Sequence, residues 1–208
     1  MATLDDIVSA AAKVFRTKGY HAATVRDIAD EVGLLKGSLY HHFDSKEELL
    51  YLVVKDPIAQ MYRTMAEIAG AEGRASDKLR RAISAHLEAF DHHYPHLFVY
   101  LRERESVKQR FREKIGFYPK DYERCWQQIL REGVESGEFR ADLDIQVASY
   151  GLLGMLNWLY KWYDPQGRLS VQEVAEQFTT LALAGLAADG SRTFSTAKPK
   201  RARIKPAS

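Results

Sequence analysis

The stretch from Thr24 to Phe43, TVRDIADEVGLLKGSLYHHF, constrains the fold of this chain more than any other part of it. Its apolar residues recur at helical spacing on both sides of Gly33, a residue that can adopt the positive φ of a tight turn. Ala29 is small enough for two helices to approach each other closely, and Leu39 can pack the second helix onto the first. The stretch therefore predicts two short helices joined at a glycine, the helix-turn-helix arrangement.

Three short helices are predicted to share one small core at this end of the chain. Thr3 is a candidate N-cap for the first helix, and Gly19 ends that helix. Thr24 is the candidate N-cap of the second helix, with Asp27 three residues later. The apolar positions predict two inner faces, one of Val25, Ile28, Ala29 and Val32, the other of Leu35, Leu39 and Phe43.

The outward face of the third helix carries the candidate binding residues, because side chains that do not build the core are free to enter a DNA major groove. Gly37 is a poor helix former, so either a phosphate or base edge approaches closely there or the glycine merely frays the helix start. Free amides at the starts of the second and fourth helices can assist phosphate contacts. The predicted DNA-binding residues are Thr24, Arg26, Lys36, Gly37, Ser38, Tyr40, His41 and Lys46.

The distribution of charge argues against a strongly basic DNA-binding region. The 208-residue chain has a formal net charge of +2, but six basic residues and no acidic one lie beyond Ser191. Residues 1–55 hold seven basic and eight acidic side chains. A helix-turn-helix in this setting must cluster its few cations on one face. The basic tail is expected to be disordered, and it either adds non-specific DNA contacts or only aids solubility.

The middle of the chain predicts further helices. Ser45 and Glu48 form a capping box for a fourth helix, and Pro57 is expected to kink or end it. Ser76 is a candidate cap for the next helix. Five cations between Arg104 and Lys114 form either a solvated helix face or an attraction for a polyanionic effector.

Three histidines, at positions 92, 93 and 96, suggest either a metal site or a polar corner between helices. The corner is favoured, because Pro95 breaks the helix and no acidic or cysteine ligand follows at suitable spacing. No metal, cofactor or catalytic residue is predicted. Cys125 is expected to be a buried, inert thiol.

Residues 145–163 are the most apolar part of the chain, and they are apolar on two faces. A helix of this kind must bury one face against its own domain and the other against something else. Together with the last helix, which Ser170 and Glu173 begin, it forms an antiparallel pair that can meet its symmetry mate in a homodimer. The predicted interface residues are Leu152, Leu156, Leu159, Tyr163, Val174, Phe178 and Leu181.

Residues 24–29, Gly33, Lys36–Phe43 and Ser45–Leu50 resemble the N-terminal signature of TetR-type repressors. The resemblance implies an all-α homodimer of about nine helices, with a three-helix DNA-binding head and a C-terminal helical domain for ligand binding and dimerisation. It places these domains at residues 1–45 and 46–187, followed by the basic tail at 188–208. The implied function is a repressor that a small-molecule effector releases from a palindromic operator in double-stranded DNA.

The second half is similar to a TetR subgroup that responds to acyl-CoA thioesters, on the strength of Glu138-Phe-Arg, residues 154–163 and the final helix. Arginines or lysines near a pocket mouth would suit the phosphates, and aromatic and methionine walls would suit the acyl part. From the spacing alone, a packed core would show the same aromatic stripe of Tyr122 and Trp126 and is the favoured interpretation. The candidate effector residues are Met61, Phe98, Arg102, Arg104, Tyr122, Trp126, Met155, Trp158 and Lys161.

Two rival functions remain open at this stage. A multidrug sensor of the same family would present a promiscuous aromatic pocket to cationic or aromatic compounds. An enzyme or non-DNA adaptor is disfavoured, because the chain has no nucleophile elbow, phosphate-binding glycine loop or credible metal set. No signal peptide and no uncharged apolar run long enough to cross a membrane is recognised, so we expect a cytoplasmic protein with no membrane partner.

Overall fold

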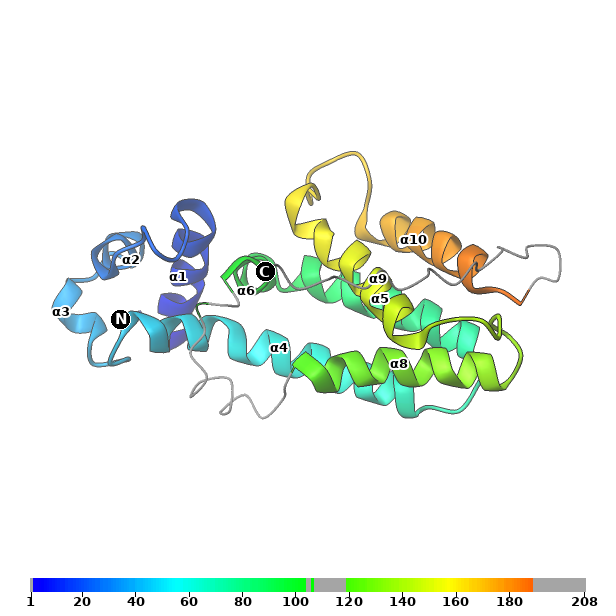
Figure 1. Cartoon of the computed structure of the whole chain (residues 1–208). Coiled ribbons are helices and arrows are strands. Elements are labelled where there is room, and N and C mark those ends of the chain that lie inside the picture. Colours follow the sequence, from blue (N-terminus) through cyan, green and yellow to red (C-terminus); the bar gives the residue numbers. More distant parts are fainter. Residues whose placement is uncertain (1, 104–105, 107–118, 189–208) are drawn as a thin grey trace, which may run out of the picture.

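A computed structural model of the chain describes residues 2–103, 106 and 119–188, and these are all-helical (Figure 1). The described part holds nine α-helices and one isolated β-bridge between Phe139 and Ala187. This confirms the predicted fold class. In chain order the elements are α1 (Leu4–Lys18), α2 (Val25–Val32), α3 (Lys36–Leu39), α4 (Lys46–Gly70), α5 (Ala75–His92), α6 (His96–Glu103), α8 (Pro119–Glu135), α9 (Ile145–Asn157), the short 3₁₀ helix η2 (Trp158–Lys161) and α10 (Val171–Leu186).

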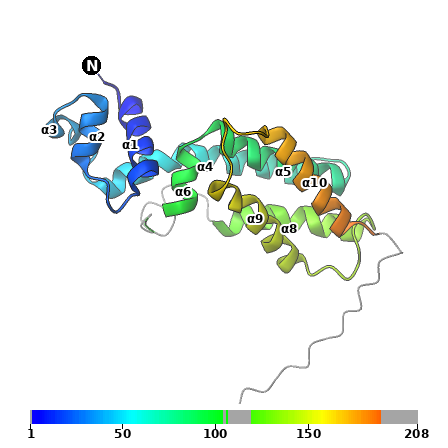
Figure 2. The same cartoon turned by 90° about the horizontal axis from the view of Figure 1, so that it is seen from above.

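The molecule has a small head and a larger body, which α4 connects. Figure 1 shows α1, α2 and α3 gathered at one end, with α4 running from them into the bundle of α5, α8, α9 and α10. Seen from above, α6 lies between α1 and the bundle (Figure 2). No helix in the described ranges has the length and apolar character that a membrane span requires.

The predicted N-caps and the predicted glycine turn are confirmed where the stabilising partner is only a few residues away in the sequence. Thr3, Thr24 and Ser170 each accept the amide of the residue three positions on, and the acidic residue there completes a capping box. Ser45 caps α4 through the Glu48 amide. Gly33 has a φ of 68° and ends α2 in the left-handed conformation that its lack of a side chain permits.

Three details differ from the sequence predictions or narrow them. Leu35 is 81% exposed at the N-cap of α3, so its assignment to the core is wrong, whereas Leu39 and Phe43 are buried. Of the two outcomes expected at Pro57, a kink or a helix end, the end is excluded, because α4 continues to Gly70 with Pro57 buried inside it. Ser76 does not cap α5; the Glu138 carboxylate accepts the amides of Ala75 and Ser76 at 2.9 and 3.2 Å and stabilises that helix start from across the fold.

Helix α8 packs closely against the loop that follows it, and a substitution at this contact tests the packing of the body. A Cβ on Gly133 would lie 2.0 Å from Cδ2 of the buried Phe139 ring. Gly133→Ala is therefore expected to destabilise the protein by roughly 1–3 kcal/mol in urea unfolding. Gly70→Ala is the matched control, because nothing lies within 4 Å of its Cβ position. The control should change the stability by no more than about 0.5 kcal/mol, and an equally stable Gly133→Ala variant would contradict this packing.

Candidate functional site

The residues predicted on the outward face of the third helix lie partly on α3 and partly on the turn after it, because α3 ends at Leu39 and is shorter than the sequence predicts. Leu39 is fully buried, and the next residue, Tyr40, is 46% exposed. The Lys36 ammonium lies 6.0 Å from the centre of the Tyr40 ring. Gly37 has no atom within 4 Å of its Cβ position, so packing within the chain does not require a glycine there. Lys36, Tyr40 and His41 therefore form an accessible face that can donate hydrogen bonds.

Two further predicted DNA-binding residues lie at the start of α2. Thr24 and Arg26 are both exposed there. The Thr24 hydroxyl already donates to the Asp27 carboxylate at 2.8 Å and accepts the Asp27 amide at 3.1 Å. The pKa of Asp27 is lowered to about 2, first by the hydrogen bond from Lys18 and then by those from Thr24. This acid is thus paired inside the head, which reduces the repulsion that the composition alone suggests.

Lys46 is occupied inside the protein. Its ammonium donates to the carbonyl oxygens of Tyr20, His21 and Ala23 at 3.0, 3.3 and 3.0 Å and lies 4.7 Å from the centre of the Tyr20 ring. An ammonium has three N–H donors, so these carbonyls use all of them. Lys46 ties the loop between α1 and α2 to the start of α4, and a phosphate contact by Lys46 stays a prediction.

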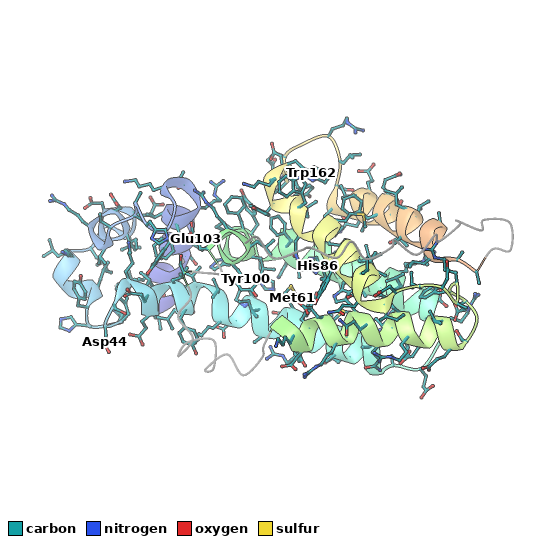
Figure 3. All side chains as sticks on the ribbon, in the orientation of Figure 1. Asp44, Met61, His86, Tyr100, Glu103 and Trp162 are labelled. Carbon is teal, nitrogen blue, oxygen red and sulfur yellow. The ribbon has the colours of Figure 1, made fainter. Side chains whose placement is uncertain are left out.

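The candidate effector residues separate into an interior and a surface group. Trp126 is fully buried, and Tyr122, Met61 and Met155 pack against the same core. Phe98 lies between Tyr94 and Tyr160, with ring centres 6.0 and 5.9 Å away. Figure 3 shows Met61 and His86 inside the body. The interior group therefore surrounds the middle of the body.

The surface group lies on η2. Trp158 is 59% exposed, and the Lys161 ammonium lies 6.0 and 5.0 Å from the ring centres of Trp158 and Tyr160. Arg104 lies outside the described residues. A cationic side chain over exposed aromatic rings is a suitable contact for a planar, anionic group.

One cavity of about 380 Å³, open to solvent, lies where α4, α5 and the start of α10 meet. Of the predicted effector residues only Met61 lines it. Glu88, Asp91 and His92 give its wall a polar character. Among the described residues no group of three or more His, Cys, Asp or Glu side chains is placed to hold a metal. The histidines after α5 lie at the corner between α5 and α6.

Arg102 does not lie with the interior group; it contacts the head. Its Nη1 donates to the Arg16 carbonyl at 3.2 Å, and the neighbouring Glu103 accepts the Tyr20 amide at 3.2 Å. Arg16 in turn donates to the Tyr94 hydroxyl at 2.9 Å. The contacts of Arg102 and Glu103 join α6 to the end of α1 and the residues after it across more than eighty residues of sequence. Sequence reasoning missed Glu103 as a junction residue, because no local pattern marks so distant a partner.

The two apolar faces of α9 are used in the opposite way to the prediction. Leu152, Leu156, Leu159 and Val174 are buried within this single chain, so they cannot also meet a second copy. Tyr163 is partly buried and donates to Asp91. Leu181 is exposed as predicted, together with four residues that were not assigned to the interface, Val147, Tyr150, Trp158 and Trp162. These five large apolar side chains lie on α9, on η2, directly after η2 and on α10.

Comparison with known proteins follows the division into head and body. Residues 7–52 match the family model described as "Bacterial regulatory proteins, tetR family", and residues 72–186 match "Tetracyclin repressor-like, C-terminal domain". The transcriptional repressor KstR2 of Mycobacterium tuberculosis is 32% identical over 187 residues, which cover 89% of this chain and 93% of the relative. The Bacillus subtilis fatty acid metabolism regulator is 33% identical over 153 residues, or 73% and 78% of the two chains.

Solved structures show the same fold over nearly the whole chain. The structure of the ketosteroid transcriptional regulator KstR2 of M. tuberculosis has a TM-score of 0.84 at 31% identity and covers 90% of this chain and 96% of that one. AibR in complex with isovaleryl coenzyme A and operator DNA has a TM-score of 0.76 at 22% identity, with 86% and 96% covered. At that identity the likeness to AibR concerns the fold alone.

Proposed function

This chain belongs to the tetR family of bacterial regulatory proteins, and from that premise we propose that it is a repressor which an acyl-CoA thioester releases from its operator. As a regulator of this family it binds operator DNA and a small-molecule effector as a homodimer. We infer that it acts in the cytoplasm, where bacterial DNA lies. A two-fold symmetric dimer presents its two heads to a palindromic site with one half-site for each head.

The accessible face of α3 is the single observation that carries the operator-binding proposal. Lys36 lies on α3, and Tyr40 and His41 lie on the turn directly after it, while Leu39 at the end of α3 is buried in the core of the head. Such a helix can enter the major groove without losing its own packing. Thr24, Arg26, Gly37 and Ser38 complete the proposed surface.

Leu35 extends this surface with an apolar contact. It lies directly before Lys36, is exposed, and makes no side-chain cap at a helix start where Ser, Thr, Asp or Asn would stabilise the fold. The stability of the head therefore gives no reason for a leucine there. In the major groove, the 5-methyl group of thymine is the partner that an exposed aliphatic side chain suits best.

The effector proposal rests on the separation between the interior and surface groups. An acyl chain needs apolar walls, which Met61, Trp126 and Met155 supply inside the body. Phosphates need cations and water, and Lys161 with Trp158 supplies an exposed basic and aromatic site. The relatives named for ketosteroid and fatty acid regulation support this chemistry, and AibR shows that a protein of this fold can hold a coenzyme A thioester.

Coupling between the sites is proposed to pass through α6. This helix contacts the aromatic residues around Phe98 on one side and the head on the other, through Arg102 and Glu103. The effector is proposed to bind more tightly to a state in which α6 has moved and the two heads have a different separation. At saturating effector, the affinity for the operator falls by the ratio of the effector affinities in the moved state and in the DNA-bound state. Glu103→Gln is expected to weaken this coupling while leaving effector binding in place.

The operator surface is tested by substitutions on α3. Tyr40→Ala should lower the affinity for an operator fragment selected from random DNA by about tenfold, a loss of roughly 1–3 kcal/mol. Lys36→Ala should also reduce the salt dependence of binding by about one phosphate contact. Fluorescence anisotropy measures both changes. Arg80→Ala, an exposed cation on α5, is the control. Unchanged operator binding by Tyr40→Ala would contradict the placement.

Leu35→Ser should move stability and binding in opposite directions. A serine N-cap and the loss of an exposed leucine should stabilise the protein by about 0.5–2 kcal/mol. Operator affinity should fall by about fourfold, the value of one buried methyl group. Replacing individual operator thymines by deoxyuracil should reproduce this loss for the wild type and have no further effect on Leu35→Ser. If all such replacements affect both proteins equally, Leu35 does not contact a thymine methyl group.

The effector class is tested by release from the operator and by calorimetry. Decanoyl-CoA should bind and release the wild-type protein, whereas free coenzyme A and the cationic dye ethidium should not. Glu103→Gln should bind decanoyl-CoA with unchanged affinity but release less DNA. Glu138→Gln is the matched control, since Glu138 also accepts backbone amides but lies away from the head. Release by ethidium and not by decanoyl-CoA would favour a multidrug sensor.

A further inference from the structure

Three aromatic side chains form a buried cluster in the middle of the body. His86 comes from α5, and Tyr122 and Trp126 come from α8. Their ring centres are separated by 5.9 Å (His86 to Tyr122), 6.1 Å (His86 to Trp126) and 6.4 Å (Tyr122 to Trp126), so each ring contacts the other two. His86 Nδ1 lies 2.9 Å from the Tyr122 hydroxyl. Figure 3 shows His86 inside the body near Met61. We call these three residues the interior triad.

The interior triad is polar but uncharged. Burial lowers the pKa of His86 to about 4, and the hydrogen bond that the imidazole donates to the Asn157 side chain offsets only part of this effect. Burial also raises the pKa of Tyr122 well above its usual range. The imidazole is therefore neutral and the phenol protonated at physiological pH. A charged ligand group would find no opposite charge in this triad, and burying such a charge is costly.

One donor of the triad is unused. Trp126 is fully buried, and its Nε1 has no hydrogen-bond partner among the described residues. The N–H lies near enough to the Tyr122 oxygen to act against the rise in the Tyr122 pKa, but it does not reach hydrogen-bond geometry. An unsatisfied buried donor is rare and destabilising. Apolar side chains could fill this part of the core without a buried donor, so the indole N–H calls for an acceptor.

We propose that the interior triad is a recognition subsite for an uncharged carbonyl or hydroxyl oxygen of the effector, which accepts the Trp126 N–H while His86 and Tyr122 surround it. This inference rests on the proposed acyl-CoA effector and narrows its class. The oxygen has two possible sources, the thioester carbonyl or a second oxygen on the acyl group. A plain alkyl group at the triad leaves the donor unsatisfied, and sites built to hydrogen-bond a ligand discriminate strongly against analogues that lack the partner.

Three kinds of probe distinguish these sources in calorimetry with the full-length protein. S-decyl-CoA has no thioester carbonyl, decanoyl-CoA has that carbonyl alone, and oxodecanoyl-CoAs with one ketone at successive positions add a second oxygen. The wild type should bind at least one oxygen-bearing probe about tenfold or more tightly than S-decyl-CoA. Trp126→Phe should abolish that preference. Trp162→Phe, which changes an exposed tryptophan, should keep it.

The indole N–H resonances give a second readout that does not depend on a variant that folds. The chain has three tryptophans, and the preferred probe should move the Trp126 N–H proton downfield while S-decyl-CoA should not. A preference that survives in Trp126→Phe, or a Trp126 resonance that responds equally to all probes, overturns the inference. If the probes bind with equal affinity, only the subsite fails. If no coenzyme A thioester binds at all, the proposed effector class fails with it.

Discussion

Burial of α4 along nearly its whole length is the constraint on which the rest of this structure depends. Leu49 and Leu50 belong to the core near the head, and Met65 and Ile68 belong to the core of the body. The helix passes through Pro57 without ending, so both cores are built on one continuous element. If helices of the body shift relative to α4, the head must move as well, because both cores pack on this helix and packed interiors do not deform freely. This shared helix gives a small effector a mechanical connection to the DNA-binding face.

Contacts within the head occupy some of its charged side chains, including one of its acids. Lys18 neutralises Asp27 at 2.6 Å, and the Lys46 ammonium is held by three carbonyl oxygens at the other end of the loop. Lys36 on α3 and Arg26 on α2 are therefore opposed by fewer acids than the composition of the head suggests. Operator affinity would then depend on a small number of placed contacts and on the presence of two heads in a dimer.

In the body, the interior triad and the cation of Lys161 lie in separate places. The interior triad is neutral and lies deep between α5 and α8, while the cation of Lys161 lies on the surface. An amphiphilic ligand with an apolar part and a phosphate-bearing part matches this separation better than a compact cation would. The exposed side of α9 and α10, with Tyr150 and Leu181, remains for the second copy.

The sequence by itself determined the elements whose causes are local. N-caps at Thr3, Thr24 and Ser170 depend on a residue three positions away, and Gly33 needs only its own φ. The accessible face around Tyr40 also followed from helical spacing. The family signature then identified the architecture, because short motifs specify the head almost completely.

Only the tertiary structure decided which of two similar faces lies inside. Both sides of α9 are apolar, so periodicity could not tell that Leu152 and Leu156 belong to the core and Val147 and Tyr150 to the surface. It could not find Glu103 beside Tyr20, Glu138 at the start of α5, or the unused N–H of Trp126. These features depend on partners far away in sequence, or on the lack of one, and the burial energy of the whole chain sets them rather than any local preference.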